Sequence, residues 1–252
     1  MPPTDTEADG DDEQEPENTD EQGRTVREER TLSPMRRTIA DRLQESYRNA
    51  VHVTASREVD AEALVRAADT ADDRLDADVS IIDLVLCALS ATLDEHPAFN
   101  ATFEEGTHCL YEQHNVGVAV DIEAGLVTPV LRDVGSKSLG DIATERRELT
   151  ESVRAGDYSM SDLRGGTVTV TNLGVLGVDS FTPVINPPEV AILGVNRIRE
   201  RAERGDDGVE FRRRTNFDLS FDHRVVDGAD AARFLDTLAD EVTDAEAFVP
   251  DE

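Results

Sequence analysis

The spacing of apolar and polar positions along this chain predicts both helices and strands. Ser33 followed by a proline is a good helix start, and Met35, Ile39, Leu43 and Tyr47 then form one apolar stripe. Strands are predicted at residues 51–59, 116–121, 126–132, 167–171, 190–195 and 216–221, and a tight hairpin at residues 103–111.

Capping residues place the other helix starts. Asp60 is expected to cap a helix that runs to about residue 74. Ser80 with Asp83, and Ser138 with Asp141, have capping-box spacing. Residues 81–93 are apolar nearly all round, so that helix should be buried, and residues 229–242 form the last helix. Helices and strands alternate without repeats, which predicts one α/β domain with a mixed sheet.

The first 30 residues differ from the rest. They contain twelve Asp or Glu, three Arg and only one β-branched aliphatic residue, Val26. Such a segment cannot bury enough apolar surface to offset its ordering entropy, so it is expected to be a disordered acidic tail. Residues 31–252 are long enough for a single domain with a sizeable core.

Charge and cysteine content exclude several classes of function. The net charge is −30, and Lys137 is the only lysine among 25 basic residues. This composition indicates a halophilic protein that stays dissolved in very high salt, and it disfavours nucleic acid, because phosphate binding needs a basic face. No disulfide is expected, because Cys87 and Cys109 are isolated from each other in the sequence. No metal site is expected either, because neither the cysteines nor the histidines are clustered. No signal peptide or membrane span is visible, so the protein is expected in the cytoplasm.

Candidate chemistry centres on residues 221–228. His223 precedes Asp227 by four positions, between a predicted strand and a predicted helix. A histidine held at such a turn can take and return a proton near neutral pH. Thr171 and Asn172 end another strand just before a glycine turn. A base on one loop and a hydroxyl donor on another suit acyl transfer, in which the base deprotonates the acceptor and the donor stabilises the oxyanion.

Several segments resemble the catalytic domain of dihydrolipoamide acyltransferases, the core subunits of 2-oxoacid dehydrogenase complexes. The matching segments are residues 36–40, 52–54, 96–100, 125–130, 171–174, 181–194 and 221–228. They occur in the order found in the family, from about residue 31 to 249. The resemblance implies a chloramphenicol-acetyltransferase-like two-layer α/β sandwich with a mixed sheet, assembled as a trimer or a higher multiple, with active sites between subunits.

The resemblance also implies a role for each candidate residue. His223 would take the thiol proton of coenzyme A, which is a substrate here, so that the thiolate attacks an acyl-dihydrolipoyl thioester. Thr171 lies where the family has the serine or threonine that stabilises the oxyanion. Asp227 lies where the family has an acidic or amide residue, and we expect a supporting role, through an ion pair with Arg37, in preference to direct contact with His223. The simpler interpretation is a helix N-cap ahead of Gly228, and Asp227 could serve as both.

One departure concerns the lipoyl group. Family members carry a lipoyl domain with a modified lysine and a small subunit-binding domain, and this chain is expected to lack both. Lys137 lies at a predicted helix start and not in a lipoyl hairpin. The expected partners are therefore a separate lipoyl-bearing protein and dehydrogenase subunits. Two alternatives remain open: a non-catalytic scaffold core, and a coenzyme A-dependent acyltransferase acting on a free small molecule.

The sequence leaves the acyl group undetermined. It assigns no residue to coenzyme A; Lys137 with Arg132 could contact its phosphates, although a solvated loop charge is the simpler interpretation.

Overall fold

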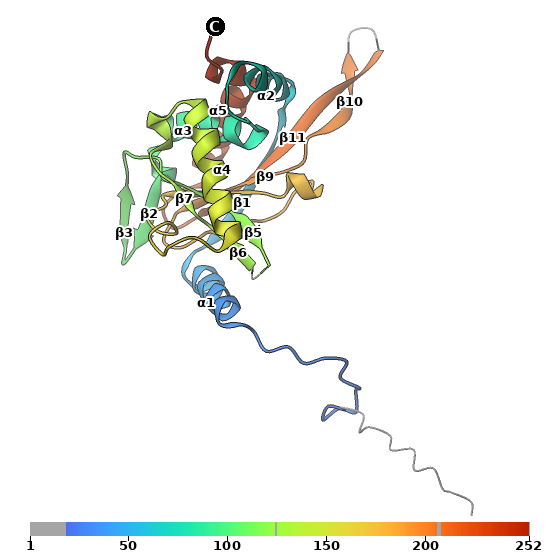
Figure 1. Cartoon of the computed structure of the whole chain (residues 1–252), viewed down its shortest axis with the longest axis vertical. Coiled ribbons are helices and arrows are strands. Elements are labelled where there is room, and N and C mark those ends of the chain that lie inside the picture. The colour runs from blue at the N-terminus through green and yellow to red at the C-terminus, as the bar shows by residue number, and fades with distance from the viewer. Residues whose placement is uncertain (1–18, 124, 206–207, 252) are drawn as a thin grey trace, which may run out of the picture.

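A mixed seven-stranded sheet organises the chain (Figure 1). The computed structural model describes residues 19–123, 125–205 and 208–251. In spatial order the strands are β1 (His52–Asp60), β11 (Gly208–Asp222), β9 (Ala191–Val195), β8 (Val168–Asn172), β4 (Val116–Val118) and β7 (Val130–Leu131); β10 (Arg199–Gly205) pairs with β11 beside this path. β8 runs parallel to β4 and β9, and the other neighbours are antiparallel. The predicted mixed sheet is therefore confirmed.

Two short hairpins lie outside this sheet. The predicted hairpin is confirmed as β2 (Ala101–Glu104) and β3 (Thr107–Leu110), and its turn holds Glu105 and Gly106 at positive φ. The second pairs β5 (Val120–Ile122) with β6 (Gly125–Val127). The strands expected at 116–121 and 126–132 are thus each broken in two, because β4 pairs with β7 and β8 whereas β5 pairs with β6, and because Pro129 has no N–H for a ladder.

In the described residues, five helices of at least 13 residues accompany the sheet. They are α1 (Pro34–Asn49), α2 (Glu62–Arg74), α3 (Ile81–Glu95), α4 (Leu139–Ala155) and α5 (Gly228–Thr243), with 3₁₀ turns at Pro97–Phe99, Val134–Ser136, Gly174–Leu176 and Ala245–Phe248. The helix starts predicted at Ser33, Ser80 and Ser138 are confirmed as N-caps. The prediction for Asp60 was wrong by one residue. Ala61 is the N-cap of α2, and Asp60 ends β1 while its carboxylate accepts the Glu62 N–H at 2.9 Å.

The core lies between the sheet and the helices α3 and α5. The side chains of Leu84, Leu89 and Phe234 are fully buried there. Phe99 packs with its ring centroid 4.6 Å from that of Phe234 and 6.5 Å from that of Phe221 on β11. As predicted, α3 is buried on most of its circumference.

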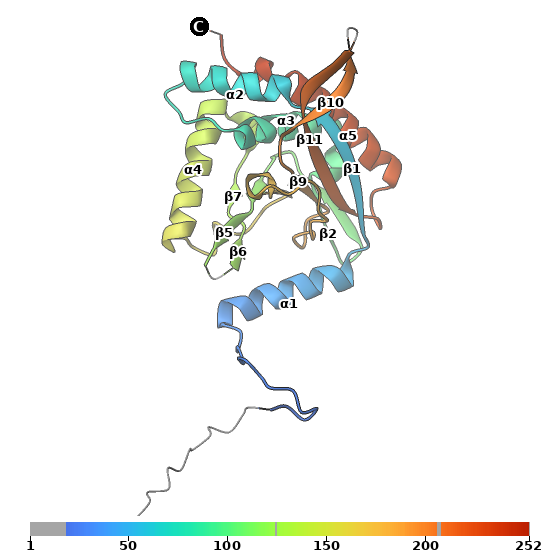
Figure 2. The ribbon, with the colours of Figure 1, turned by 90° about the vertical axis from the view of Figure 1, so that its right-hand side faces the viewer.

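Helix α1 lies at one end of the domain, and the β10–β11 hairpin projects at the opposite end (Figures 1 and 2). Only the first half of the predicted α1 stripe is covered. Met35 packs near the β5–β6 hairpin, whereas Leu43 and Tyr47 are exposed. Of the predicted acidic tail, residues 1–18 lie outside the described residues. No helix in the described part of the chain is both long enough and apolar enough to cross a membrane.

Candidate active site

His223 lies directly after the last buried residue of β11. Its backbone N–H donates to the Val51 carbonyl at 2.9 Å, and its ring lies 5.7 Å from the Phe221 ring. The side chain itself is 39% exposed. The strand end and the neighbouring ring therefore hold the imidazole in place while the side chain stays partly exposed.

Asp222 and Arg224 brace this turn from both sides of His223. The Arg224 guanidinium donates to the Asp222 carboxylate at 2.9 and 2.5 Å and lies 4.6 Å above the Phe103 ring. The same carboxylate accepts the Val51 N–H at 3.2 Å, which ties the turn to β1. Burial works against the ionised form of Asp222, but the hydrogen bonds from Arg224 and Val51 outweigh it and hold the pKa of the carboxyl below its usual range.

Asp227 lies beside the imidazole and also begins α5. Its Oδ1 is 3.7 Å from His223 Nδ1, within ion-pair range but too long for a hydrogen bond. It is the N-cap of α5, as the sequence predicted. The structure shows no ion pair between Asp227 and Arg37 among the residues it describes, so that pairing is not formed within one chain.

Thr171 is placed elsewhere on the sheet. It lies on β8 opposite Gly194 of β9, and Gly194 lies opposite Asp218 of β11. His223 is five positions beyond Asp218, so it is roughly 16 Å further along the strand direction. The register therefore separates Thr171 from His223 within one chain. Thr171 is also 8% exposed, which leaves its hydroxyl little open surface.

Asp218 is a buried carboxylate near Thr171 that sequence reasoning missed. It is fully buried and accepts hydrogen bonds from Ser56 on β1, from the Phe181 N–H at 2.9 Å and from Asn196 Nδ2 at 2.7 Å. The bonded Phe181 packs its ring against Gly194, the residue that pairs with Thr171. Asp218 thereby fixes the loop next to the Thr171 strand.

Glu189 is a second buried carboxyl that sequence reasoning missed. It is 5% exposed and accepts from Thr169 Oγ1 at 2.6 Å and from Asn186 Nδ2 at 3.0 Å. Burial is the largest influence on its acidity, and it raises the pKa of Glu189 to about 7 despite these bonds and the charge of Arg42. Its position between Pro188 and an all-apolar strand was the available signal for burial.

The remaining candidates are engaged in structural contacts. Lys137 Nζ donates to the Arg132 carbonyl and pairs with Glu145 at 3.2 Å, and the Arg132 guanidinium donates to the Ser161 and Arg164 carbonyls.

Cys87 and Cys109 are free thiols. Burial raises the pKa of the Cys87 thiol to about 12, with the Asp83 charge adding to the effect. Within the described residues no group of His, Cys, Asp or Glu is arranged to hold a metal ion.

Comparison with known proteins identifies relatives over most of the chain. The family described as 2-oxoacid dehydrogenases acyltransferase (catalytic domain) matches residues 25–249. A succinyltransferase component of the 2-oxoglutarate dehydrogenase complex from Bartonella vinsonii subsp. berkhoffii is 37% identical over 90% of this chain and 56% of its own length. An acetyltransferase component of the pyruvate dehydrogenase complex from Zymomonas mobilis is 35% identical over 81% of this chain and 47% of its own. The chain thus spans about half the length of these relatives.

Solved structures agree with this match. The dihydrolipoamide acetyltransferase of Azotobacter vinelandii superposes with a TM-score of 0.83 at 32% identity, covering 88% of this chain and 94% of that one. Work on that enzyme concerns the catalytic role of a serine, a histidine 52 positions later and an asparagine four positions after that. A chloramphenicol acetyltransferase shares the fold, with a TM-score of 0.53 at 16% identity over 83% of this chain and 94% of that one. The predicted fold class is confirmed.

Proposed function

The chain belongs to the 2-oxoacid dehydrogenase acyltransferases, as a catalytic domain, and we propose that it transfers an acyl group between a dihydrolipoyl thioester and coenzyme A. The observation that carries the proposal is the spacing of the candidate residues. Thr171 precedes His223 by 52 positions and Asp227 follows it by four, the same separations as the serine, histidine and asparagine of the Azotobacter enzyme. A scaffold core would need none of the three.

In the proposed reaction His223 is the general base. The imidazole takes the thiol proton of coenzyme A, and the thiolate sulfur attacks the carbonyl carbon of the acyl-dihydrolipoyl thioester. The tetrahedral oxyanion accepts a hydrogen bond from the Thr171 hydroxyl. The intermediate then expels the dihydrolipoyl sulfur, which takes the proton back from His223. Asp227, with Oδ1 3.7 Å from Nδ1, keeps a carboxylate beside the imidazole during the two proton transfers.

The proposed active site is shared by two copies of the chain. The sheet register separates Thr171 from His223 within one chain, so each working site would combine His223 of one subunit with Thr171 of the next. A closed trimer supplies three equivalent sites of this kind. This assembly would be the core to which dehydrogenase subunits bind.

The lipoyl group would be presented from outside residues 1–252. A lipoyl-lysine needs an exposed lysine at a hairpin, and Lys137, the only one in the sequence, is held by Arg132 and Glu145. We therefore propose a lipoyl-bearing protein as partner. We also propose a cytoplasmic, halophilic setting; the charge of −30 with a single lysine supports the halophilic part.

The test is acyl transfer from acetyl-, succinyl-, isobutyryl- and isovaleryl-coenzyme A to free dihydrolipoamide in multimolar potassium chloride. The His223→Ala protein should assemble normally and lose roughly 10²- to 10⁴-fold in rate. The matched control is His108→Ala, which removes a histidine of β3 whose ring bonds the Ala98 carbonyl. Equal activity of wild type and His223→Ala would refute the proposal. Transfer to small alcohols or amines but not to dihydrolipoamide would identify a different acceptor.

A further inference from the structure

Glu189 lies between the two parts of the candidate site. On one side its Oε2 bonds Thr169, which is two positions before Thr171 on β8 and on the same face of that strand. On the other side the next residue, Val190, accepts the Asp222 N–H at 2.9 Å, one position before His223. The Glu189 side chain thus bonds the strand that carries the hydroxyl donor, and the backbone of the next residue bonds the turn that carries the base.

The connection also reaches α1. Asn186 Nδ2 donates to Glu189 Oε1 at 3.0 Å, while its Oδ1 accepts from the Arg42 guanidinium at 3.3 Å. Arg42 also donates to the Pro187 carbonyl at 3.0 Å. Glu189 and Arg42 both line a cavity of about 450 Å³. Its other charged lining residues are Glu45, Glu104, Glu105, Asp222 and Arg224.

The two hydrogen bonds of Glu189 respond differently to protonation. An amide nitrogen can only donate, so Asn186 always needs an acceptor at Oε1. A threonine hydroxyl can do both. When Glu189 is ionised, Thr169 donates to Oε2 in a charge-assisted bond of 2.6 Å. When Glu189 is neutral, its own O–H must donate to Thr169 Oγ1, so the bond reverses and loses its charge assistance.

We infer that Glu189 is a positioning residue whose ionised form fixes the Thr171 strand and the His223 turn of one chain, each in the active site to which it contributes. The inference rests on the proposed function. Its pKa of about 7 means that the exchange between the two forms falls near neutrality. Protonation weakens the bond to β8, and the rate of acyl transfer falls with it.

Glu189→Gln isolates this effect because glutamine reproduces the neutral acid. Its Nε2 donates to Thr169 and its Oε1 accepts from Asn186. The informative quantity is the ratio of wild-type kcat to Glu189→Gln kcat, because any pH dependence that the two proteins share cancels. We expect a ratio near one at about pH 5.5, rising to roughly tenfold at about pH 8, below the roughly 10²-fold that a 1 Å misplacement can cost. KM for coenzyme A and dihydrolipoamide should change little.

Glu45→Gln is the matched control, since Glu45 lines the same cavity but is exposed on α1. Its ratio should stay flat with pH. A flat ratio for Glu189→Gln would overturn the positioning role, and so would a ratio that falls with pH. Neither result would affect the catalytic role of His223, which His223→Ala tests separately.

The protonation state can be followed without any activity. Infrared difference spectra between about pH 5.5 and pH 8 should show a buried protonated carboxyl that disappears with a midpoint of about 7. The band should be missing in Glu189→Gln and present in Glu45→Gln. In Arg42→Gln it should disappear at a higher pH, because this substitution removes a cation that favours the ionised form of Glu189. Absence of the band from the wild type, or its persistence in Glu189→Gln, would show that Glu189 does not exchange protons in this range and would overturn the inference.

Discussion

The two halves of β11 are held in different ways. Residues 215–222 lie between β1 and β9, and Phe217, Leu219 and Phe221 there are fully buried. Residues 208–214 pair with β10 in the projecting hairpin, where Val209 is 71% and Phe211 68% exposed. One continuous strand is thus a core element at one end and a surface element at the other.

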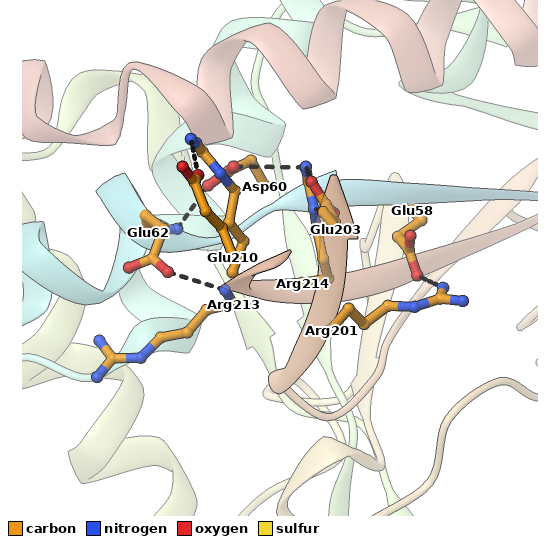
Figure 3. Close-up of polar contacts among 9 residues, drawn as sticks. Glu58, Asp60, Glu62, Arg201, Glu203, Glu210, Arg213 and Arg214 are labelled. Atoms are coloured by element: carbon orange, nitrogen blue, oxygen red, sulfur yellow. Dashed lines mark hydrogen bonds and ion pairs between the residues drawn. The ribbon is translucent and has the colours of Figure 1, made fainter. Parts of the chain in front are cut away.

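Ion pairs replace apolar burial in the outer half (Figure 3). Arg214 donates to Glu203 at 2.6 Å, Arg201 pairs with Glu58, and the Arg213 N–H donates to Glu62 at 2.8 Å. Burying a phenylalanine contributes roughly 1.5–3 kcal/mol, whereas an exposed ion pair contributes about 0–1 kcal/mol. His223 therefore lies at the end of the half that is fixed by packing, and its position is less sensitive to salt than the outer half is.

The largest expected effect comes from one substitution made in both halves. Phe217→Ala empties a fully buried site and should lower the free energy of unfolding by roughly 3–5 kcal/mol. Phe211→Ala, six positions away and 68% exposed, should stay within about 0.5 kcal/mol of the wild type. Denaturant unfolding of both variants measures the difference. A loss above about 1 kcal/mol for Phe211→Ala would show that another copy or a partner covers the hairpin.

Thr171→Ala tests whether the buried sheet also carries chemistry. Removing one oxyanion donor should lower kcat by roughly 10²- to 10³-fold, about 2.7–4 kcal/mol. Unfolding should change little, because the structure records no side-chain hydrogen bond for Thr171 in the described residues. The control is Thr70→Ala on α2, whose hydroxyl only bonds the Arg66 carbonyl. Equal kcat values for the two variants would remove Thr171 from the mechanism.

The sequence predicted the inner half of β11 and missed the outer half. Residues 216–221 alternate in an apolar pattern, and His223 and Asp227 follow at a spacing that a turn before a helix preserves. Residues 199–214 carry charges on both faces of the hairpin, so no apolar periodicity marks them as strands.

The burial of Asp218 and Glu189 could not be predicted in the same way, because their partners come from distant segments. Ser56 lies 162 positions from Asp218 and Thr169 lies 20 from Glu189. The separation of Thr171 from His223 likewise depends on strand order, which local pattern does not determine.

Asp218→Asn should have an intermediate effect. Phe181 N and Asn196 Nδ2 can only donate, so the new amide must keep its oxygen toward them and turn its NH₂ toward Ser56 and Ser180. The weaker neutral bonds should cost about 1–3 kcal/mol of unfolding free energy. Glu203→Gln, which neutralises a carboxylate of the outer half, should cost less than Asp218→Asn, because solvent screens an exposed ion pair. A larger cost for Glu203→Gln than for Asp218→Asn would reverse the ranking of the two halves.

The smallest expected effect is the coupling between Arg201 and Glu58, whose side chains are 47% and 33% exposed. A double-mutant cycle with alanine should give roughly 0.2–1 kcal/mol at about 0.1 M salt. In multimolar potassium chloride the Debye length falls to about 3 Å or less, so the coupling should vanish. A coupling that survived at high salt would mean that the pair is shielded from solvent by another subunit. If it vanishes, this pair contributes nothing in the salt for which the composition is suited, and backbone hydrogen bonds, to β10 and from Arg213 to Glu62, keep the hairpin in place. The histidine turn, packed on Phe221 and braced by the buried Asp222, would keep its geometry in both conditions.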